Sequence, residues 1–106
     1  MKKKLKTQKQ NSIKAQSVHG QKLEYEGSIV IIGDLNGGGE VIAGENIAVI
    51  GAIRGLAHAG AKGNKKAIIT AGTIEAPQIR IANIVKDEVP AKTTYAYVKE
   101  NEIILE

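Results

Sequence analysis

The chain has no cysteine, no tryptophan and no phenylalanine, and its only aromatic residues are Tyr25, Tyr95 and Tyr97. Without cysteine there can be no disulfide, no thiolate metal ligand and no cysteine nucleophile. Apolar runs such as residues 29–32 are far too short to span a bilayer. The N-terminal lysines are not followed by the apolar stretch of a signal peptide. We therefore expect a soluble, cytoplasmic protein with an aliphatic core.

Positive charge is concentrated at the N-terminus. Residues 1–16 contain six lysines and no acidic residue, whereas residues 17–106 carry nine basic and eleven acidic side chains. Because the lysine-rich segment has little apolar surface to bury, we predict a disordered tail over residues 1–16 and a folded domain over residues 17–106. Such a tail could be attracted weakly to an anionic membrane. Nucleic acid is not expected as a partner, because the domain has no basic stripe with interleaved aromatics.

An 18-residue repeat organises the domain. When residues 28–45 are written above residues 46–63, the apolar positions coincide and Gly33 falls over Gly51. A third, slightly shifted block covers residues 66–81. Short β-branched pieces between regularly spaced glycines are typical of brief strands joined by glycine corners, and not of helices.

Fixed-period repetition of short strands predicts an all-β protein, specifically a short parallel β-helix (solenoid) of three to four coils. Each coil buries its apolar face only against the next. The segment KLEYEGS is expected to be an entry strand. After Pro90, YAYV and IILE on either side of residues 99–102 predict a C-terminal hairpin cap. A β-sandwich with hairpins is the less favoured alternative, because it does not account for the 18-residue register.

A coil this narrow does not have enough interior space to bury all of the aliphatic side chains. Strand alternation must therefore direct Val30 or its neighbours outward. An outward aliphatic face on a parallel sheet is normally covered. We expect a second copy to cover it, so the sequence predicts a homodimer.

No catalytic constellation is recognisable. The segment from Gly55 to Lys62 resembles a phosphate-binding loop but lacks the lysine and the hydroxyl residue at their required positions. His19 and His58 are the only histidines, so no metal site and no cofactor are predicted. A hexapeptide acyltransferase with His58 as the base is the one enzymatic alternative, and the hexapeptide spacing lasts for too few steps to favour it.

Four stretches carry a family resemblance: IGDLN, GGGEV, GAIRGLAHAGAKGN and QIRIA. Together they make residues 17–106 resemble the C-terminal domain of the septum site-determining MinC family. The resemblance implies a right-handed triangular β-helix that dimerises through a hydrophobic face. It also implies a non-enzymatic role in division-site selection. The domain would bind the ATPase MinD, be recruited by it to the inner face of the membrane, and target inhibition of FtsZ ring assembly.

The resemblance also implies partner-binding residues. The family's MinD-binding segment usually reads Arg-Ser-Gly-Gln, and this chain has Val18-His19-Gly20-Gln21. Gly20 and Gln21 match that segment. The resemblance assigns the same partner site to Asp34, which matches a family position, and we add the neighbouring Asn36 and His19. Ordinary turn chemistry would account for Asp34 and Asn36 equally well.

Arg54 and His58 are further candidates for partner or dimer contacts. A dimer would present the site twice to a two-fold MinD dimer. The rival from another class is a structural polymer that resembles the bactofilins and stacks end to end. The MinC N-terminal domain is not in this sequence, so the chain is expected to be either a fragment or a short natural relative.

Overall fold

The computed structural model describes residues 11–106, which form eleven strands and no helix. The strands are β1 (Ser12–Val18), β2 (Lys22–Tyr25), β3 (Ser28–Leu35), β4 (Glu40–Ala43), β5 (Ile47–Ile53), β6 (Leu56–Ala59), β7 (Ile69–Ile74), β8 (Gln78–Ile81), β9 (Ile84–Asp87), β10 (Tyr95–Lys99) and β11 (Glu102–Leu105). They build two sheets. Sheet A has the order β1-β3-β5-β7-β10-β11, and sheet B has the order β2-β4-β6-β8-β9.

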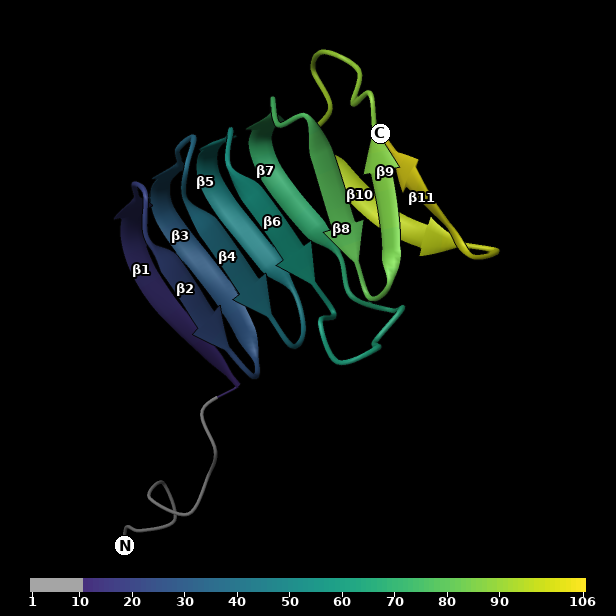
Figure 1. Ribbon diagram of the computed structural model, residues 1–106, viewed down its shortest axis with the longest axis horizontal. Helices are drawn as coiled ribbons and strands as arrows, with labels where there is room; N and C mark the ends of the chain where they lie inside the picture. Colours follow the sequence, from purple (N-terminus) through teal and green to yellow (C-terminus); the bar gives the residue numbers. More distant parts are fainter. Residues whose placement is uncertain (1–10) are drawn as a thin grey trace, which may run out of the picture.

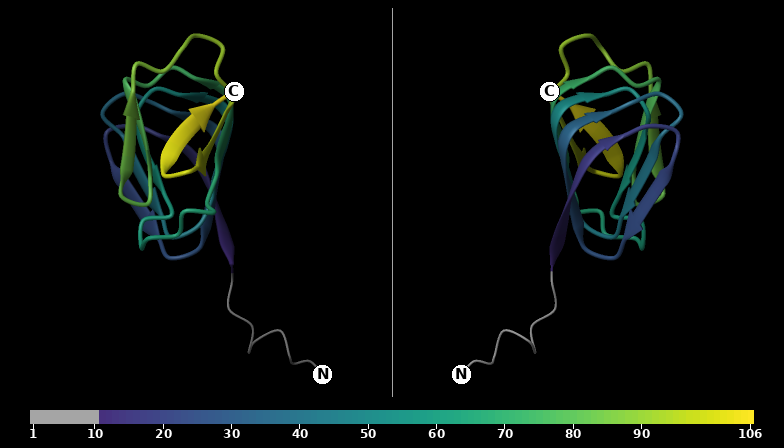
Figure 2. Two further views of the ribbon diagram at one scale, coloured as in Figure 1. Left: turned by 90° about the vertical axis from the view of Figure 1, so that its right-hand side faces the viewer. Right: turned by 90° about the vertical axis from the view of Figure 1, so that its left-hand side faces the viewer.

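Four coils make up the solenoid, and each contributes one strand to each sheet (Figure 1). In the view of Figure 1 the chain advances from left to right, rises along sheet A at the back and descends along sheet B at the front, so the coil is right-handed (Figures 1 and 2). Equivalent residues pair in parallel: Ile29 lies beside Ile47, as the 18-residue repeat predicts. Ile47 pairs with Ile69, which is 22 residues further on, because the loop over residues 61–66 is inserted there. The predicted parallel β-helix is confirmed.

The cross-section is a triangle with one short side. Sheets A and B are the long sides. The short side is formed by the residues that follow the bend in each coil, and in β3 and β5 a glycine lies at this bend. At this corner Gly33 and Gly51 have φ angles of 133° and 147°, and a Cβ on Gly51 would collide with the carbonyl oxygen of Gly33. Glycine is therefore required by both conformation and space.

Aliphatic side chains stacked from coil to coil form the core. Ile29, Ile47 and Ile69 are fully buried in register inside sheet A, and Val41 and Ala57 face them from sheet B. Each such isoleucine stabilises the fold by roughly 1.5–3 kcal/mol through removal of its apolar surface from water. Among residues 11–106 the buried apolar side chains are all aliphatic, and the partly buried Tyr25 packs against them.

The C-terminal end of the solenoid is covered. β10 pairs antiparallel with β7 and turns back into β11, with positive φ angles at Glu100 and Asn101 that fit a tight hairpin turn. The predicted hairpin cap is confirmed. The segment predicted as the entry strand does form a strand, β2, but the solenoid begins one strand earlier, at β1. An additional strand, β9, folds antiparallel onto β8 and ends sheet B.

The N-terminal boundary differs from the prediction. Residues 12–16, assigned to the disordered tail, lie in β1, where Ile13 pairs with Ile29 and Ala15 with Ile31. The prediction is wrong for these residues. A strand added to an existing sheet gains a ladder of backbone hydrogen bonds, so only two inward side chains, Ile13 and Ala15, are needed in addition to order it. Residues 1–10 lie outside the described residues.

Candidate functional site

The predicted partner residues lie on the short side of the triangle, near the first coil. Outward side chains from successive coils form a column there: His19, Asn36, Arg54 and Glu75. Val18, Leu35, Ile53 and Ile74 are the buried neighbours that hold this column in register. We call His19, Gly20, Gln21, Asp34 and Asn36 the corner site.

Hydrogen bonds fix the first-coil part of the corner site. The backbone N–H of His19 donates to Gln21 Oε1 at 2.9 Å, and Asn36 Nδ2 lies 3.2 Å from His19 Nδ1. Gly20 between them has a φ of +62° and lies directly over Gly38 of the next coil. The turn therefore presents the Gln21 amide NH2, the His19 ring and the Asn36 side chain on one exposed surface.

Asp34 has a structural task besides any role in binding. Its backbone N–H donates to Ser17 Oγ at 3.0 Å, and its own Oδ1 accepts a hydrogen bond from the backbone N–H of Ala52 at 2.8 Å. At the glycine corner the ladder of sheet A is interrupted, so these side chains supply the acceptors that a neighbouring carbonyl would otherwise provide. Oδ1 is thus used inside the fold, and Oδ2 lies on the partly exposed side, toward Arg54.

Arg54 joins the corner site to the later coils. Its Nη1 lies 4.0 Å from Asp34 Oδ2, and its Nε donates to Glu75 Oε1 at 3.0 Å. These three side chains are each almost half exposed. Glu75 was missed by the sequence reasoning, although its place below Arg54 in the repeat was a signal that could have identified it.

His58 is separate from the corner site. It lies in sheet B, where it pairs with Ile42 and Arg80, and its Nε2 is 2.7 Å from the carbonyl oxygen of Ala82. The structure therefore brings together Gly20, Gln21, Asp34, Asn36 and His19, places Arg54 beside them, and leaves His58 on another face.

A second candidate surface is the outer face of sheet A. Ile50 and Ile32 are large apolar side chains that remain 65% and 42% exposed, and they are neighbours across β3 and β5. Towards the cap, Tyr95 and Tyr97 stack with ring centroids 5.3 Å apart. Reduced hydration raises the pKa of Tyr97, and so does the Glu106 carboxylate, whose Oε2 accepts a hydrogen bond from the Tyr97 hydroxyl at 3.2 Å. An apolar face of this kind is typical of a protein interface.

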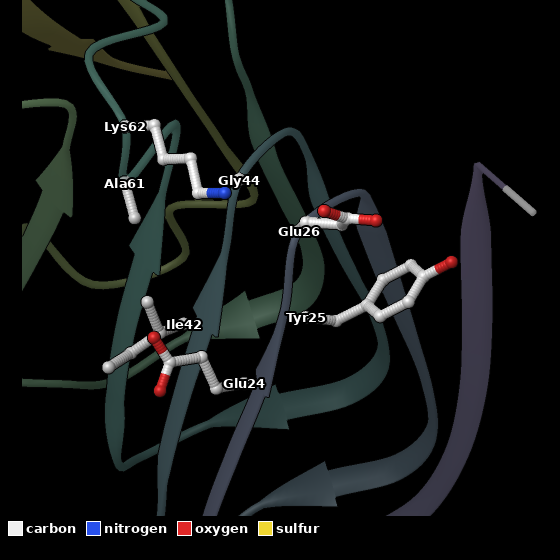
Figure 3. Close-up of a pocket in the computed structure, with 7 residues that line it drawn as sticks. All are labelled: Glu24, Tyr25, Glu26, Ile42, Gly44, Ala61 and Lys62. Carbon is white, nitrogen blue, oxygen red and sulfur yellow. The ribbon is translucent and has the colours of Figure 1, made fainter. Parts of the chain in front are cut away.

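Two open pockets also lie on the surface of the protein. One, of about 360 Å³, adjoins the corner site and is lined by Gly38, Glu40, Arg54 and Gln78 among others. The other, of about 470 Å³, lies over sheet B, with the carboxylates of Glu24 and Glu26 on one side and Lys62 on the other (Figure 3). Neither is lined by serine, threonine, cysteine or histidine. Within residues 11–106 no group of three or more His, Cys, Asp or Glu side chains could hold a metal ion, and no helix could cross a membrane.

Comparison with known proteins supplies independent information. Residues 11–106 match the family described as "Septum formation inhibitor MinC, C-terminal domain". The probable septum site-determining protein MinC of Geobacillus kaustophilus (strain HTA426) is 46% identical over 94 residues, which are 82% of this chain and 41% of that protein. The corresponding protein of Caldanaerobacter subterraneus subsp. tengcongensis is 48% identical over 91 residues, 81% of this chain and 42% of that protein.

A solved structure shows the same fold. The matched chain belongs to the "MinC:MinD cell division protein complex" of Aquifex aeolicus, with a TM-score of 0.83 and 31% sequence identity over 92% of this chain and 86% of that chain. The present chain spans about two fifths of the length of the curated relatives named above.

Proposed function

The chain belongs to the family of MinC C-terminal domains, and from this premise we propose that it is a non-enzymatic adaptor in division-site selection. In this proposal it forms a homodimer and binds a MinD-type ATPase. That ATPase recruits it from the cytoplasm to the inner face of the membrane. The complex then targets inhibition of FtsZ ring assembly.

Binding to a MinD-type ATPase rests chiefly on one observation. The solenoid superimposes over most of its length on a chain from a MinC:MinD complex at 31% identity, a level at which surfaces as well as folds can be retained. The corner site offers the chemistry for such a contact. It is a rigid turn with exposed amide and imidazole groups, and a rigid surface loses little conformational entropy on binding.

Within the corner site, we assign the direct contacts to Gln21 and Asn36. Gln21 uses its Oε1 to accept the N–H of His19, so its NH2 group points away from the turn. Asn36 is held at both backbone groups, by Val18 O and by the N–H of Gly39. Asp34 Oδ1 is bonded to Ala52, so only Oδ2, which is partly exposed and lies 4.0 Å from Arg54 Nη1, could contact a partner.

Homodimerisation uses the outer face of sheet A in this proposal. Covering Ile50 and Ile32 with the same face of a second copy would remove from water the two most exposed isoleucines of residues 11–106. A two-fold dimer then carries two corner sites. Because engagement of one site raises the effective concentration of the other, a two-fold ATPase dimer would be bound more tightly than a monomer.

A pull-down with ATP-bound MinD tests the proposal. We expect Gln21→Ala and Asp34→Asn to reduce capture at least about tenfold, which corresponds to roughly 1.4 kcal/mol. Asp34→Asn is preferred to alanine because an amide oxygen can still accept the N–H of Ala52. Arg80→Ala, on the outer face of sheet B, is the matched control and should bind as the unmodified chain does. Equal capture of all variants would remove the corner site from the interface.

A further inference from the structure

The two ends of the solenoid differ. At the C-terminal end the β10–β11 hairpin and β9 cover the last coil, whereas within residues 11–106 no strand pairs with the outer edge of β1 or of β2. As a result, inward side chains of the first coil remain partly exposed. Ile13, Ala15 and Leu23 of the first coil are only partly buried, although the residues they pair with in the second coil are fully buried. The N-terminal end therefore presents both backbone hydrogen-bonding groups and core side chains.

The hydrogen-bond pattern identifies which residues form this edge. Asn11 O accepts the N–H of Ser28, and Gln21 O accepts the N–H of Glu40. In a parallel ladder alternate residues bond to the same neighbour. Odd-numbered residues of β2 and of the first part of β1 therefore bond inward to the second coil. The N–H and C=O groups of the even-numbered residues point away from the solenoid: Ser12, Lys14, Gln16, Lys22 and Glu24.

Strand β2 is complementary to a second copy of itself. In an antiparallel pair centred on Leu23, Lys22 of each copy lies opposite Glu24 of the other. Both are exposed and neither forms an ion pair within residues 11–106. The two Leu23 side chains meet on the core side. A pair centred on residue 22 or 24 would instead place like charges opposite one another, which is unfavourable.

Strand β1 allows the same symmetry. Its seven residues have Ala15 at their midpoint, so an antiparallel pair centred there uses the whole strand and places Lys14 opposite Gln16. A pair centred on Lys14 would place two lysines together. Of the usual protections of an open edge, the strand has the outward-facing Lys14 and a bulge between Gln16 and Val18, but no proline and no inward-facing charge.

We propose that the N-terminal end of the solenoid is a homotypic interface at which two copies stack end to end, with β1 and β2 each pairing antiparallel with its counterpart. The sheets and the aliphatic core then continue from one copy into the next. This surface is distinct from the outer face of sheet A. The inference does not rest on the proposed ATPase partner, and with both surfaces occupied the protein would form chains longer than a dimer.

Charge reversal tests the β2 register. On the full chain carrying Ile50→Lys, which removes association through sheet A, the self-association constant is measured by analytical ultracentrifugation. We expect Lys22→Glu and Glu24→Lys each to weaken association by about 5- to 30-fold, since two cross-strand pairs turn repulsive. The double swap Lys22→Glu/Glu24→Lys should restore it to within about twofold. Lys86→Glu on β9, at the covered end, is the control and should have no effect.

Disulfide trapping tests the geometry directly, because the chain has no cysteine of its own. Residues 15 and 23 would be non-hydrogen-bonded pairs, whose Cβ atoms are close enough for a disulfide. Ala15→Cys and Leu23→Cys should therefore form cross-linked dimers on mild oxidation, while Lys22→Cys, which faces Glu24, should form few. A chain carrying Ile50→Lys that stays monomeric up to millimolar concentration, with no cross-link at position 15 or 23, would overturn the proposal. Cross-linking at position 22 in preference to 23 would overturn the register.

Discussion

The carboxylate of Asp34 accepts the backbone N–H of Ala52, a residue 18 positions later in the chain, at 2.8 Å. One coil thus caps the next at the point where glycine interrupts the ladder of sheet A. The same contact is made one coil earlier, between Ser17 Oγ and the N–H of Asp34. A residue suspected of partner binding is therefore also part of the scaffold, and the two roles need separate tests.

Replacing Asp34 by alanine should destabilise the fold, whereas replacing it by asparagine should not. Alanine leaves the N–H of the buried Ala52 without an acceptor, which costs about 1–3 kcal/mol, while asparagine keeps an oxygen at the same position. Urea unfolding followed by circular dichroism measures the difference. Asp87→Ala, which removes an exposed carboxylate on β9, is the control and should change the free energy of unfolding by less than about 0.5 kcal/mol. Equal stability of the Asp34→Ala and Asp34→Asn variants would contradict the structural role.

Gly51→Ala should be among the most destabilising single substitutions. The new Cβ would collide with the Gly33 carbonyl and the Asp34 carboxylate, and the φ of 147° is unfavourable for alanine. We expect a loss of more than about 3 kcal/mol. Gly37→Ala, in the turn between β3 and β4 of the preceding coil, is a matched control, since a Cβ there has nothing within 4 Å. Thermal melts of the two variants should separate clearly, and similar melting temperatures would show that the corner tolerates a side chain.

Much of the fold could be predicted from the sequence because stacking imposes a period. Gly33 over Gly51 and the aliphatic positions between them predicted the coil, and the turn over residues 99–102 predicted the cap. Strand β1 was missed, because with outward Lys14 and Gln16 it has the composition of a solvated segment. The strand is ordered because it pairs with β3, and amino-acid composition alone carries no information about such pairing.

Strand β9 was missed for a different reason. The turn that leads into it places Ala82 at a φ of +55°, and alanine gives no local signal for that conformation. At the corner site the family resemblance named Gly20, Gln21 and Asp34, but contacts between coils could not be predicted from the spacing of residues alone. That Asp34 is bonded to Ala52, and Arg54 to Glu75, depends on which side chains point outward after the glycine corner.

Ile50→Lys should abolish association through sheet A without unfolding the protein. Ile50 is 65% exposed, so its replacement leaves the core unchanged, but a dimer would have to bury two ammonium groups near its centre. Light scattering after gel filtration should show at least about a tenfold weaker dimer. Val85→Lys is the matched control, because Val85 is a similarly exposed aliphatic residue on sheet B. If Val85→Lys disrupted the dimer and Ile50→Lys did not, sheet B would be the dimer face.

Arg54→Ala separates a partner contact from a stabilising one. The ion pairs of Arg54 with Asp34 and Glu75 join side chains that are almost half exposed, and such pairs contribute about 0–1 kcal/mol in water. The free energy of unfolding should therefore change little. Glu75→Gln, which weakens the same ion pair from the other side, should be equally mild and is the control. If Arg54→Ala lowers MinD capture several-fold while Glu75→Gln does not, the guanidinium contacts the partner directly. If both variants lower capture alike, the Arg54–Glu75 ion pair acts by positioning Asp34. In that case the Arg54 guanidinium does not contact the partner directly.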